Sequence, residues 1–502
     1  MSDEPTVEET HEEETNRLVA IRRGKLRAIL DEGRDPFPVG LAAPTDTAAE
    51  LHATHGGLGP GEETGIAARV GGRIINIRSF GKLRFAVLQD PTGTIQLFVA
   101  KGALSEDDFA RFDALDHGDL VVADGEVMTT KKGELSLKVT SFELAAKSLR
   151  PLPDKWHGLQ DKQTRFRRRY LDLIVNEDAR RIAVARARIV AALRKAYADE
   201  GYLEVETPML QVQPGGAIAR PFTTHHNALD IDMYLRIAPE LYLKRLVVGG
   251  LDRVFEVNRN FRNEGIDQTH NPEFTMLEAY AAWYDAEDVM AMCERAIASV
   301  ATEVLDSMTV EFGDTTLDLT APWPRRPMAD LVSAAVGEAV SAVTPVEQME
   351  ALAEHHGIEV KPGWGSGKLL TELFEELVEP HLVGPVFVVD YPVETSPLAR
   401  VHREKEGVTE RFELFIGGWE IANGFTELND PIDQRRRFEA QAAVRDLGDD
   451  EAHVIDEDYL LALEHGMPPT GGIGIGVDRL VMLLTNTTSI REVVLFPHLR
   501  PE

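Results

Sequence analysis

The sequence predicts an α+β protein with a small β-barrel followed by a larger domain built on an antiparallel sheet. Short β-branched runs separated by Gly and Pro-Thr-Gly turns fill residues 64–146, a pattern typical of a barrel of short strands. Long helical segments alternate with hairpin-forming strands over residues 163–502, which indicates a mixed domain. A proline-bearing linker, residues 147–162, separates the two. A chain of 502 residues is long enough for both.

Composition restricts the class of protein. The content of 43% hydrophobic and 27% charged residues is that of a globular protein. The net charge of −31 argues against indiscriminate nucleic-acid binding and leaves room for a specific partner at a local basic patch. The single cysteine, Cys293, excludes an internal disulfide and suits a reducing compartment. Since the acidic amino terminus is unlike a signal peptide and no apolar run is long enough to cross a bilayer, we expect a cytoplasmic protein without a membrane segment.

The composition and residue pattern of the segments before the second domain predict their structure. Residues 1–15 carry seven acids and neither Lys nor Arg, which predicts a disordered tail. Within residues 16–63 we expect a helix that begins at about Asn16 and ends near Gly33, followed by a connector. Within residues 64–146, about five strands with one helical interruption, "SEDDFARFDAL", favour a closed barrel of the oligonucleotide-binding type. The basic run "DKQTRFRRRYLDLI" fits either a nucleic-acid patch or a solvated helix start.

The stretch "FRNEGIDQTHNPEFTMLEAY" places unusual side chains on one face of a strand. Alternation puts Phe274, Met276, Glu278 and Tyr280 together, while the intervening residues form an ordinary packing face. A carboxylate and a phenol beside an aromatic ring are poor core material. This face therefore predicts the floor of a site for a flat group and a cationic group.

The segment "RFELFIGGWEIANGFTELND" predicts a hairpin with Gly417-Gly418 as a two-residue turn. Glu413 and Glu420 are then diagonal neighbours, about 7–8 Å apart, so the two carboxylates can share divalent ions. Asn423 and the alternate residues after it would point away from Glu420 in a regular strand. A β-bulge between Glu420 and Asn423 would bring both sets to one face.

A third segment, "GGIGIGVDRLVMLL", predicts a glycine-flattened strand that leads into a helix with Arg479 at its start. Glycine lets a flat ligand lie on the strand, and arginine can flank a ring or a phosphate. The glycine spacing does not match a dinucleotide-binding fingerprint. The sequence also lacks HExxH, GxSxG and a convincing phosphate-binding loop.

These segments resemble the three signature motifs of class II aminoacyl-tRNA synthetases, with Arg262 in "FRNE", Arg479 in "GIGVDRL" and Pro208 in "GYLEVETPML". Longer segments, such as "YLRIAPELYLKRLVVGG" and "GMPPTGGIGIGVDRL", are similar to lysyl-tRNA synthetases of the bacterial class II type. The resemblance runs from about Arg22 to Pro501. It implies an OB-fold anticodon-binding domain over residues 64–146 and a class II catalytic domain over residues 163–502. The "GYLEVETPML" segment would form the interface of a homodimer.

The resemblance implies activation of L-lysine with ATP to lysyl-adenylate, followed by transfer of lysine to the 3′ end of tRNA(Lys). Catalysis would depend on Arg262 and Arg479. ATP would bind to Arg262, Glu264, His270, Phe274, Glu413 and Arg479. Mg²⁺ would bind to Glu413 and Glu420. Lysine would bind to Gly216, Glu240, Glu278, Tyr280, Asn423, Phe425 and Glu427. The anticodon would be read by Phe85, Gln96 and Glu134.

Other functions remain open on the sequence alone. Aspartyl- and asparaginyl-tRNA synthetases share the motifs, but they should carry cationic groups where this chain has Glu278 and Glu427. A lysyl-transferase that modifies a translation factor would lack the barrel, and a lysyl-lipid synthase would need membrane helices. A nucleic-acid-binding protein without enzymatic activity is the alternative of a different class. The histidines of "TTHHNALD" are interpreted as packing support for the site.

Overall fold

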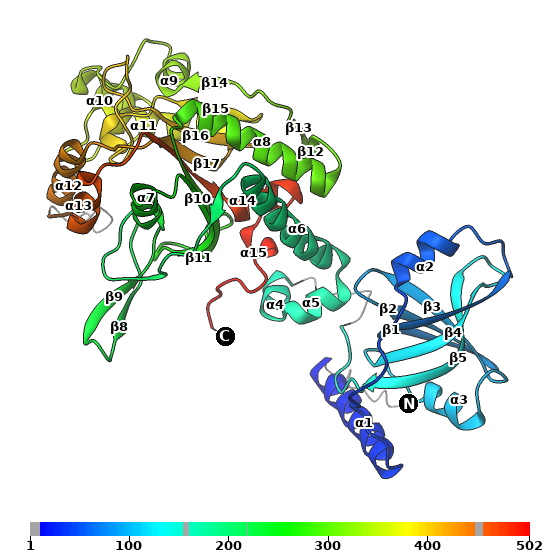
Figure 1. Cartoon of the computed structure of the whole chain (residues 1–502). Coiled ribbons are helices and arrows are strands. Elements are labelled where there is room, and N and C mark those ends of the chain that lie inside the picture. Colours follow the sequence, from blue (N-terminus) through cyan, green and yellow to red (C-terminus); the bar gives the residue numbers. More distant parts are fainter. Residues whose placement is uncertain (1–10, 154–158, 160, 218, 447–454, 502) are drawn as a thin grey trace, which may run out of the picture. The chain divides into compact units, whose positions relative to one another are not determined.

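The computed structural model describes residues 11–153, 159, 161–217, 219–446 and 455–501. The chain divides into two compact units, Met1–Gln160 and Asp161–Glu502, which are described separately (Figure 1). Of the predicted acidic tail, residues 1–10 lie outside the described residues. Helix α1 spans His11–Asp31 and so begins before the predicted start at Asn16. Glu13 and Glu14 lie near the amino end of this helix, where acidic side chains are favourable.

The first unit contains a closed five-stranded barrel, as predicted. Its strands follow the order β1-β2-β3-β5-β4. They are β1 (Glu63–Phe80), β2 (Leu83–Gln89), β3 (Thr94–Ala100), β4 (Leu120–Thr129) and β5 (Leu135–Ala146). Helix α3 (Glu106–Asp113) is the predicted interruption, and α2 (Ala48–His55) precedes the barrel. Inward-facing apolar residues of all five strands form one core with both helices.

The second unit is built on an eight-stranded sheet of order β14-β15-β16-β17-β18-β11-β10-β6. Its central strands pair antiparallel, and only the edge pairs β14–β15 and β10–β6 are parallel. The strands are β6 (Leu203–Glu204), β10 (Arg253–Phe261), β11 (Glu273–Ala282), β14 (Arg325–Pro327), β15 (Val386–Val389), β16 (Arg411–Ile416), β17 (Trp419–Thr426) and β18 (Thr470–Gly476). The α+β fold class is therefore confirmed.

Smaller elements surround this sheet (Figure 1). The helices are α4 (Lys162–Arg167), α5 (Arg169–Val175), α6 (Glu177–Asp199), α7 (Glu240–Val248), α8 (Ala286–Leu305), α9 (Met328–Val336), α10 (Val346–His355), α11 (Ser366–Leu377), α12 (Pro431–Asp446), α13 (Glu457–Glu464), α14 (Val477–Leu484) and α15 (Ile490–Val493). Two 3₁₀ turns are η1 (Glu379–His381) and η2 (Val393–Thr395). Two small sheets pair β12 (Thr309–Phe312) with β13 (Thr315–Asp318), and β7 (Leu210–Gln211) and β8 (Thr223–His226) with β9 (Ile231–Leu235).

The two faces of the large sheet have different roles. Helices α6, α8 and α14 cover one face, where they bury Leu277 and Ala279 of β11 and Ile473 and Ile475 of β18. The alternate residues of the same strands point to the opposite face, as strand geometry requires. That face carries the polar residues singled out in the sequence, so the helical layer fixes the floor of the candidate site.

The hairpin of β16 and β17 contains the predicted bulge. Gly417 and Gly418 both have positive φ, 65° and 77°, as a two-residue turn of this kind requires. Phe415 pairs with Glu420, but the next pair is Leu414 with Ala422, so Ile421 is the extra residue. Ile421 and Ala422 both enter the core. Glu420 and Asn423 consequently face the same side of the sheet.

The basic run after the linker is structural in part. Arg165 and Arg169 both form ion pairs with the buried carboxylate of Asp172, at 2.9 and 2.7 Å. Arg165 also contacts Glu492 of α15 at 3.0 Å. These arginines therefore connect α4 and α5 to the carboxyl-terminal segment.

Strands β17 and β18 approach each other closely at Gly424, and a substitution at this position tests the packing. A Cβ at this position would lie 2.6 Å from the carbonyl oxygen of Gly472 and 2.6 Å from Cζ of Phe412. Overpacking of this kind costs about 1–3 kcal/mol. We expect Gly424→Ala to lower the free energy of unfolding by that amount in urea denaturation. Gly384→Ala, where nothing lies within 4 Å, is the matched control. Equal stability of the two variants would contradict the packing described.

Candidate active site

Two adjoining cavities lie on the open face of the sheet, with volumes of about 250 and 270 Å³. The first cavity is lined from β11, β17, β18 and α7, together with the segment 395–399. The second cavity is lined from β11, β17, the loop after β10 and the start of α14. Four residues line both: Arg262, Met276, Asn423 and Gly474. Arg262 therefore reaches both cavities.

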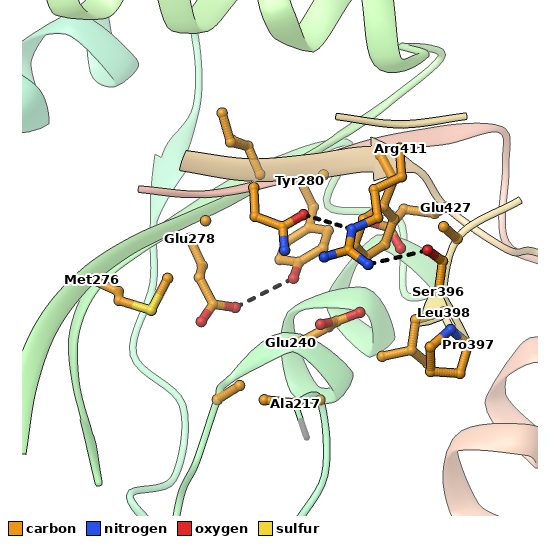
Figure 2. A pocket seen from close by; sticks show the side chains of 18 of the residues that line it. Ala217, Glu240, Met276, Glu278, Tyr280, Ser396, Pro397, Leu398, Arg411 and Glu427 are labelled. Carbon is orange, nitrogen blue, oxygen red and sulfur yellow. Dashed lines mark hydrogen bonds between the residues drawn. The ribbon is translucent and has the colours of Figure 1, made fainter. Parts of the chain in front are cut away.

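The first cavity is surrounded by buried carboxylates. Glu278 extends from β11, Glu240 from the first turn of α7, and Glu427 follows β17 (Figure 2). These side chains belong to residues that are 5%, 7% and 1% exposed. The hydroxyl of Tyr280 donates to Glu278 at 3.3 Å. Carboxylates in such a position are costly unless a cation pairs with them, so the cavity suits a cationic ligand.

All seven residues predicted for the lysine site line this first cavity: Gly216, Glu240, Glu278, Tyr280, Asn423, Phe425 and Glu427. Gly216 has a φ of +87°, and a Cβ there would lie 2.9 Å from Cβ of Glu240. At Gly472 a Cβ would overlap Oε1 of Glu427 and lie 2.6 Å from Cε1 of Tyr280. Glycine is therefore required at both positions for the side chains to reach the cavity.

Two basic residues of this region, Lys244 and Arg411, were not predicted from the sequence to belong to the site. Lys244 of α7 has a fully buried side chain and forms ion pairs with Glu240 and Glu427. Arg411 of β16 lines the first cavity and donates to Asn423 Oδ1 at 3.2 Å and to Ser396 Oγ at 3.1 Å (Figure 2). The i,i+4 spacing of Glu240 and Lys244 in "YLRIAPELYLKRLVVGG" was a usable signal, because residues at this spacing interact if the segment is helical. Arg411 lies two residues before Glu413 on the same strand, which is the spacing of a same-face pair, whereas its contact with Ser396 comes from a separate segment.

Burial controls the protonation of the cavity carboxylates. Burial, with a contribution from Glu240, raises the pKa of Glu278 from 4.5 to about 8, although Arg262 opposes the rise. Burial also raises the pKa of Glu240 and Glu427, and the ammonium of Lys244 opposes both shifts. Burial therefore opposes the ionisation of all three carboxylates at once, and a cation that binds in the cavity favours it.

The second cavity combines a ring with cationic side chains. Five residues predicted for the ATP site line it: Arg262, Glu264, His270, Phe274 and Arg479. The guanidinium of Arg262 lies 5.0 Å from the centroid of the Phe274 ring. Arg479 donates to the carbonyl oxygen of Glu420 at 2.8 Å and lies 3.2 Å from Nε2 of His270. The arrangement suits a flat, negatively charged ligand.

Glu413 and Glu420 occupy the β16–β17 hairpin beside this cavity. Glu420 lines the second cavity, whereas Glu413 lines neither. Tyr391 donates to Glu413 at 2.7 Å and Arg411 at 2.5 Å. Burial raises the pKa of Glu413 to about 7; Arg411 opposes the rise and Glu420 adds to it. Among the described residues, no group of three or more His, Cys, Asp or Glu could hold a metal ion by itself.

The residues predicted for the barrel site lie on or beside its outer surface. Phe85 of β2 contacts Phe98 of β3 and Phe80 of β1, with ring centroids 5.4 and 5.9 Å apart. Gln96 of β3 donates to Ser136 Oγ of β5 at 2.8 Å. Glu134 is exposed in the turn that precedes β5. Phe98, which was not singled out in the sequence, places a second ring beside Phe85.

The interpretation of the "TTHHNALD" histidines as packing support is wrong. His225 and His226 lie on β8, whose residues are all exposed. His225 contacts Asp230 and Asp232 at 3.3 and 2.9 Å, and neither histidine lines a cavity of the site. The small three-stranded sheet carries β8 away from the core, which the alternation of its sequence did not reveal.

Comparison with known proteins identifies both units. The model of the family "tRNA synthetases class II (D, K and N)" matches residues 161–500, and that of the "OB-fold nucleic acid binding domain" matches residues 68–145. Lysine–tRNA ligase of Bacillus subtilis is 50% identical over 495 residues, covering 98% of this chain and 99% of the relative. The chain belongs to the lysine–tRNA ligase family.

Further members of this family are similar over the same extent. The lysine–tRNA ligase of Pectobacterium carotovorum subsp. carotovorum is 49% identical over 499 residues, covering 98% of this chain and 97% of the relative. That of Carboxydothermus hydrogenoformans is 50% identical over 489 residues, covering 97% and 99%. In the described part of the chain, no helix has the length and apolar content needed to cross a membrane.

The protonation of Glu278 predicts a pH-dependent stability. In the unfolded chain this carboxyl loses its proton near pH 4.5, whereas in the folded protein it keeps the proton until about pH 8. Between these values unfolding releases a proton, so the native state loses up to about 1.4 kcal/mol for each unit of rising pH. We expect the free energy of unfolding of Glu278→Gln to lack this decrease with pH, because glutamine does not titrate. Its free energy of unfolding in urea should increase relative to wild type from about pH 5 to about pH 8.

The exposed Glu464 supplies a control for this experiment, since Glu464→Gln should follow wild type at every pH. A difference between Glu278→Gln and wild type that stays constant across the range would show that Glu278 is ionised in the folded protein at neutral pH.

Proposed function

We propose that this chain is a lysine–tRNA ligase that activates L-lysine with ATP and transfers it to the 3′ end of tRNA(Lys). The observation that carries this proposal is the position of Arg262. It lines both the carboxylate-rich cavity and the cavity that contains Phe274 and Arg479. A reaction that joins a cationic amino acid to a nucleotide phosphate requires one cationic group at such a junction.

In the first step, the carboxylate of lysine attacks the α-phosphorus of ATP and pyrophosphate leaves. Arg262 would hold the lysine carboxylate and the α-phosphate together, which lowers the barrier by orientation and by stabilising negative charge. Phe274 would stack on the adenine ring, with Arg479 on the opposite side, while Glu264 and His270 contact the nucleotide. No protein nucleophile is needed for this step. The terminal ribose hydroxyl of tRNA then takes lysine from the adenylate and releases AMP.

Glu413 and Glu420 would hold Mg²⁺ together with the phosphates of ATP. The fit rests on two neighbouring carboxylates. One of them, Glu413, is partly buried, and both burial and Glu420 oppose its charge. Mg²⁺ commonly binds through one or two carboxylates plus substrate phosphates, so a third protein ligand is not required. When bound, the ion neutralises charge on the phosphates during pyrophosphate release.

Selection of lysine follows from the charge of the first cavity. Glu278 and Glu427, with the hydroxyl of Tyr280, would receive the ε-ammonium, while Glu240 and Gly216 would face the α-amino group. Asn423 and Phe425 would lie beside the aliphatic chain. A neutral analogue would leave buried polar groups unpaired, and sites built in this way reject such analogues by about 10⁴–10⁵. The carboxylates also disfavour aspartate and asparagine as substrates.

The barrel of the first unit would read the anticodon of tRNA(Lys). Phe85 and Phe98 provide adjacent aromatic rings on neighbouring strands, and Gln96 lies on the strand of Phe98. Single-stranded bases stack on such rings and expose their edges to polar side chains. Glu134, in the turn before β5, would be a third contact.

We also propose that two copies of the chain form a homodimer through the "GYLEVETPML" segment, residues 201–210, and the two residues that follow it. Four of its apolar side chains are exposed: Leu203, Met209, Leu210 and Val212, at 52%, 48%, 45% and 65%. Strand β6, within this segment, is an edge of the large sheet. An exposed apolar edge needs a cover, and a second copy supplies one by two-fold symmetry. Cytoplasmic location stays a prediction made from the sequence.

ATP–pyrophosphate exchange tests the activity directly. We expect exchange that depends on lysine and is absent with aspartate or asparagine. Glu427→Gln should raise the KM for lysine by about 10-fold or more and change the KM for ATP by less than about threefold, because Glu427 lines only the first cavity. Glu464→Gln is the control. Exchange with aspartate and none with lysine would refute the activity, and equal losses for both substrates would remove Glu427 from the lysine site.

Light scattering tests the dimer. The wild-type protein at micromolar concentration should have about twice the chain mass of 55.6 kDa. Val212→Asp should shift this toward the monomer, since a charge would be buried in the interface. Val39→Asp, at a residue 93% exposed in the first unit, should leave the mass unchanged. A stable, fully active wild-type monomer would argue against the proposed interface.

A further inference from the structure

Lys244 has an unusual environment for a lysine outside the substrate path. Its side chain is 0% exposed, and it does not line either cavity. The ammonium forms ion pairs with Glu240, one turn earlier on α7, and with Glu427, which follows β17. It also lies 5.9 and 5.3 Å from the ring centroids of Tyr280 and Phe425. Every one of these four neighbours lines the first cavity.

From this arrangement we propose that Lys244 is a specificity-determining positioning residue. Its ammonium is an internal counter-ion that pairs with the carboxylates of Glu240 and Glu427, favours their charged forms against burial and fixes them at the wall of the first cavity. The inference rests on the proposed function, because it concerns how the same cavity distinguishes lysine from neutral amino acids.

The charge balance of the cavity supports this role. With Glu240, Glu278 and Glu427 ionised, three carboxylates face the single ammonium of Lys244. The two negative charges that remain match the α-amino and ε-ammonium groups of one lysine molecule. The carboxylate of that lysine has a separate partner in Arg262, and Arg411, the other cation that lines the cavity, is paired with Glu413. The occupied cavity is then neutral, whereas an amino acid with an uncharged side chain leaves one buried carboxylate without a partner.

The contacts of Glu427 show why an internal cation is needed. Its Oε2 pairs with Lys244, while Oε1 lies against Gly472, which also lines the cavity. Among the described residues, neither oxygen has a hydrogen-bond partner, and only Oε2 has an ion pair. One carboxylate thus has an oxygen directed to Lys244 and another left for a ligand. Without Lys244, burial would favour the neutral acid, because the ammonium is the principal group that opposes the raised pKa.

Lys244 itself stays charged in this environment. Burial opposes its charge, but Glu240 and Glu427 outweigh burial and raise the pKa of its ammonium. The other titratable groups that face it are the phenols of Tyr280 and Tyr459. Lys244 is therefore a permanent positive charge at neutral pH, distinct from the two that the substrate brings.

The test compares wild type with Lys244→Met, Lys244→Gln and Lys244→Arg in ATP–pyrophosphate exchange, with lysine and with norleucine, which has no ε-ammonium. We expect the neutral variants to raise the KM for lysine by about 10-fold or more with little change in the KM for ATP. Their preference for lysine over norleucine should fall by about 10-fold or more. Raising the pH from about 7 to about 8.5 should restore part of the lysine affinity, because it ionises the released carboxylates. Lys244→Arg keeps the charge and should retain the preference within about fivefold.

Lys368→Met is the matched control, since Lys368 forms an i,i+4 pair with Glu372 on α11. Thermal unfolding identifies which variants are folded. A folded neutral variant that keeps its lysine preference within about twofold, or binds lysine more tightly, would overturn the inference. If neither neutral variant folds, a folded Lys244→Arg that has lost the preference would overturn it. Absence of lysine-dependent exchange by wild type would instead refute the proposed function.

Discussion

The two-residue period of the β-strand constrains this molecule more than any single contact. Each central strand of the large sheet must supply apolar side chains to helices α6, α8 and α14 on one face and functional side chains on the other. Strand β11 meets this demand by simple alternation, with Leu277 and Ala279 in the core and Glu278 and Tyr280 at the cavity. Strand β18 meets it with glycine, because Gly472 and Gly474 leave the room that the cavity side chains occupy.

Strand β17 cannot meet this demand without an irregularity. Glu420 and Asn423 are separated by an odd number of positions, yet both line the second cavity. The extra residue, Ile421, restores the register, and it enters the core beside Ala422. The bulge therefore joins the hairpin end of β17, where Glu420 faces Glu413, to the part of the strand that leads to Glu427. Two neighbouring sites are built on one continuous strand in this way.

Desolvation gives these sites their selectivity. Carboxylates buried on the open face have their charged form disfavoured, as the raised pKa of Glu278 and Glu413 shows. Each acid that stays ionised requires a cation, and the protein supplies Lys244 and Arg411 for some of them. The remaining negative charge is left for ligands. The same physical cost that makes the empty cavity unfavourable thus makes a matching cationic ligand favourable.

Local rules allowed much of the molecule to be predicted. The barrel, the hairpin turn at Gly417-Gly418, and the two faces of β11 all follow from turn chemistry and strand alternation, which depend on neighbouring residues. Even the bulge could be deduced, because the parity of Glu420 and Asn423 conflicted with a shared cleft. The start of α1 was predicted wrongly, since it depends on the interaction of acidic side chains with the helix dipole. The exposure of His225 was predicted wrongly, since it depends on a small sheet that local patterns do not report.

The sequence by itself determined the fold class, the family, and the polar face of β11, because motif spacing and periodicity are encoded along the chain. Only the tertiary structure decided which charges meet. It placed Lys244 between Glu240 and Glu427, and it brought Arg411 to Asn423 and Ser396. Glu240 and Glu427 are distant in sequence, and the strength of their interaction with one ammonium depends on separation and burial in three dimensions. Those two quantities exist only once the sheet has formed and water has been excluded from its open face.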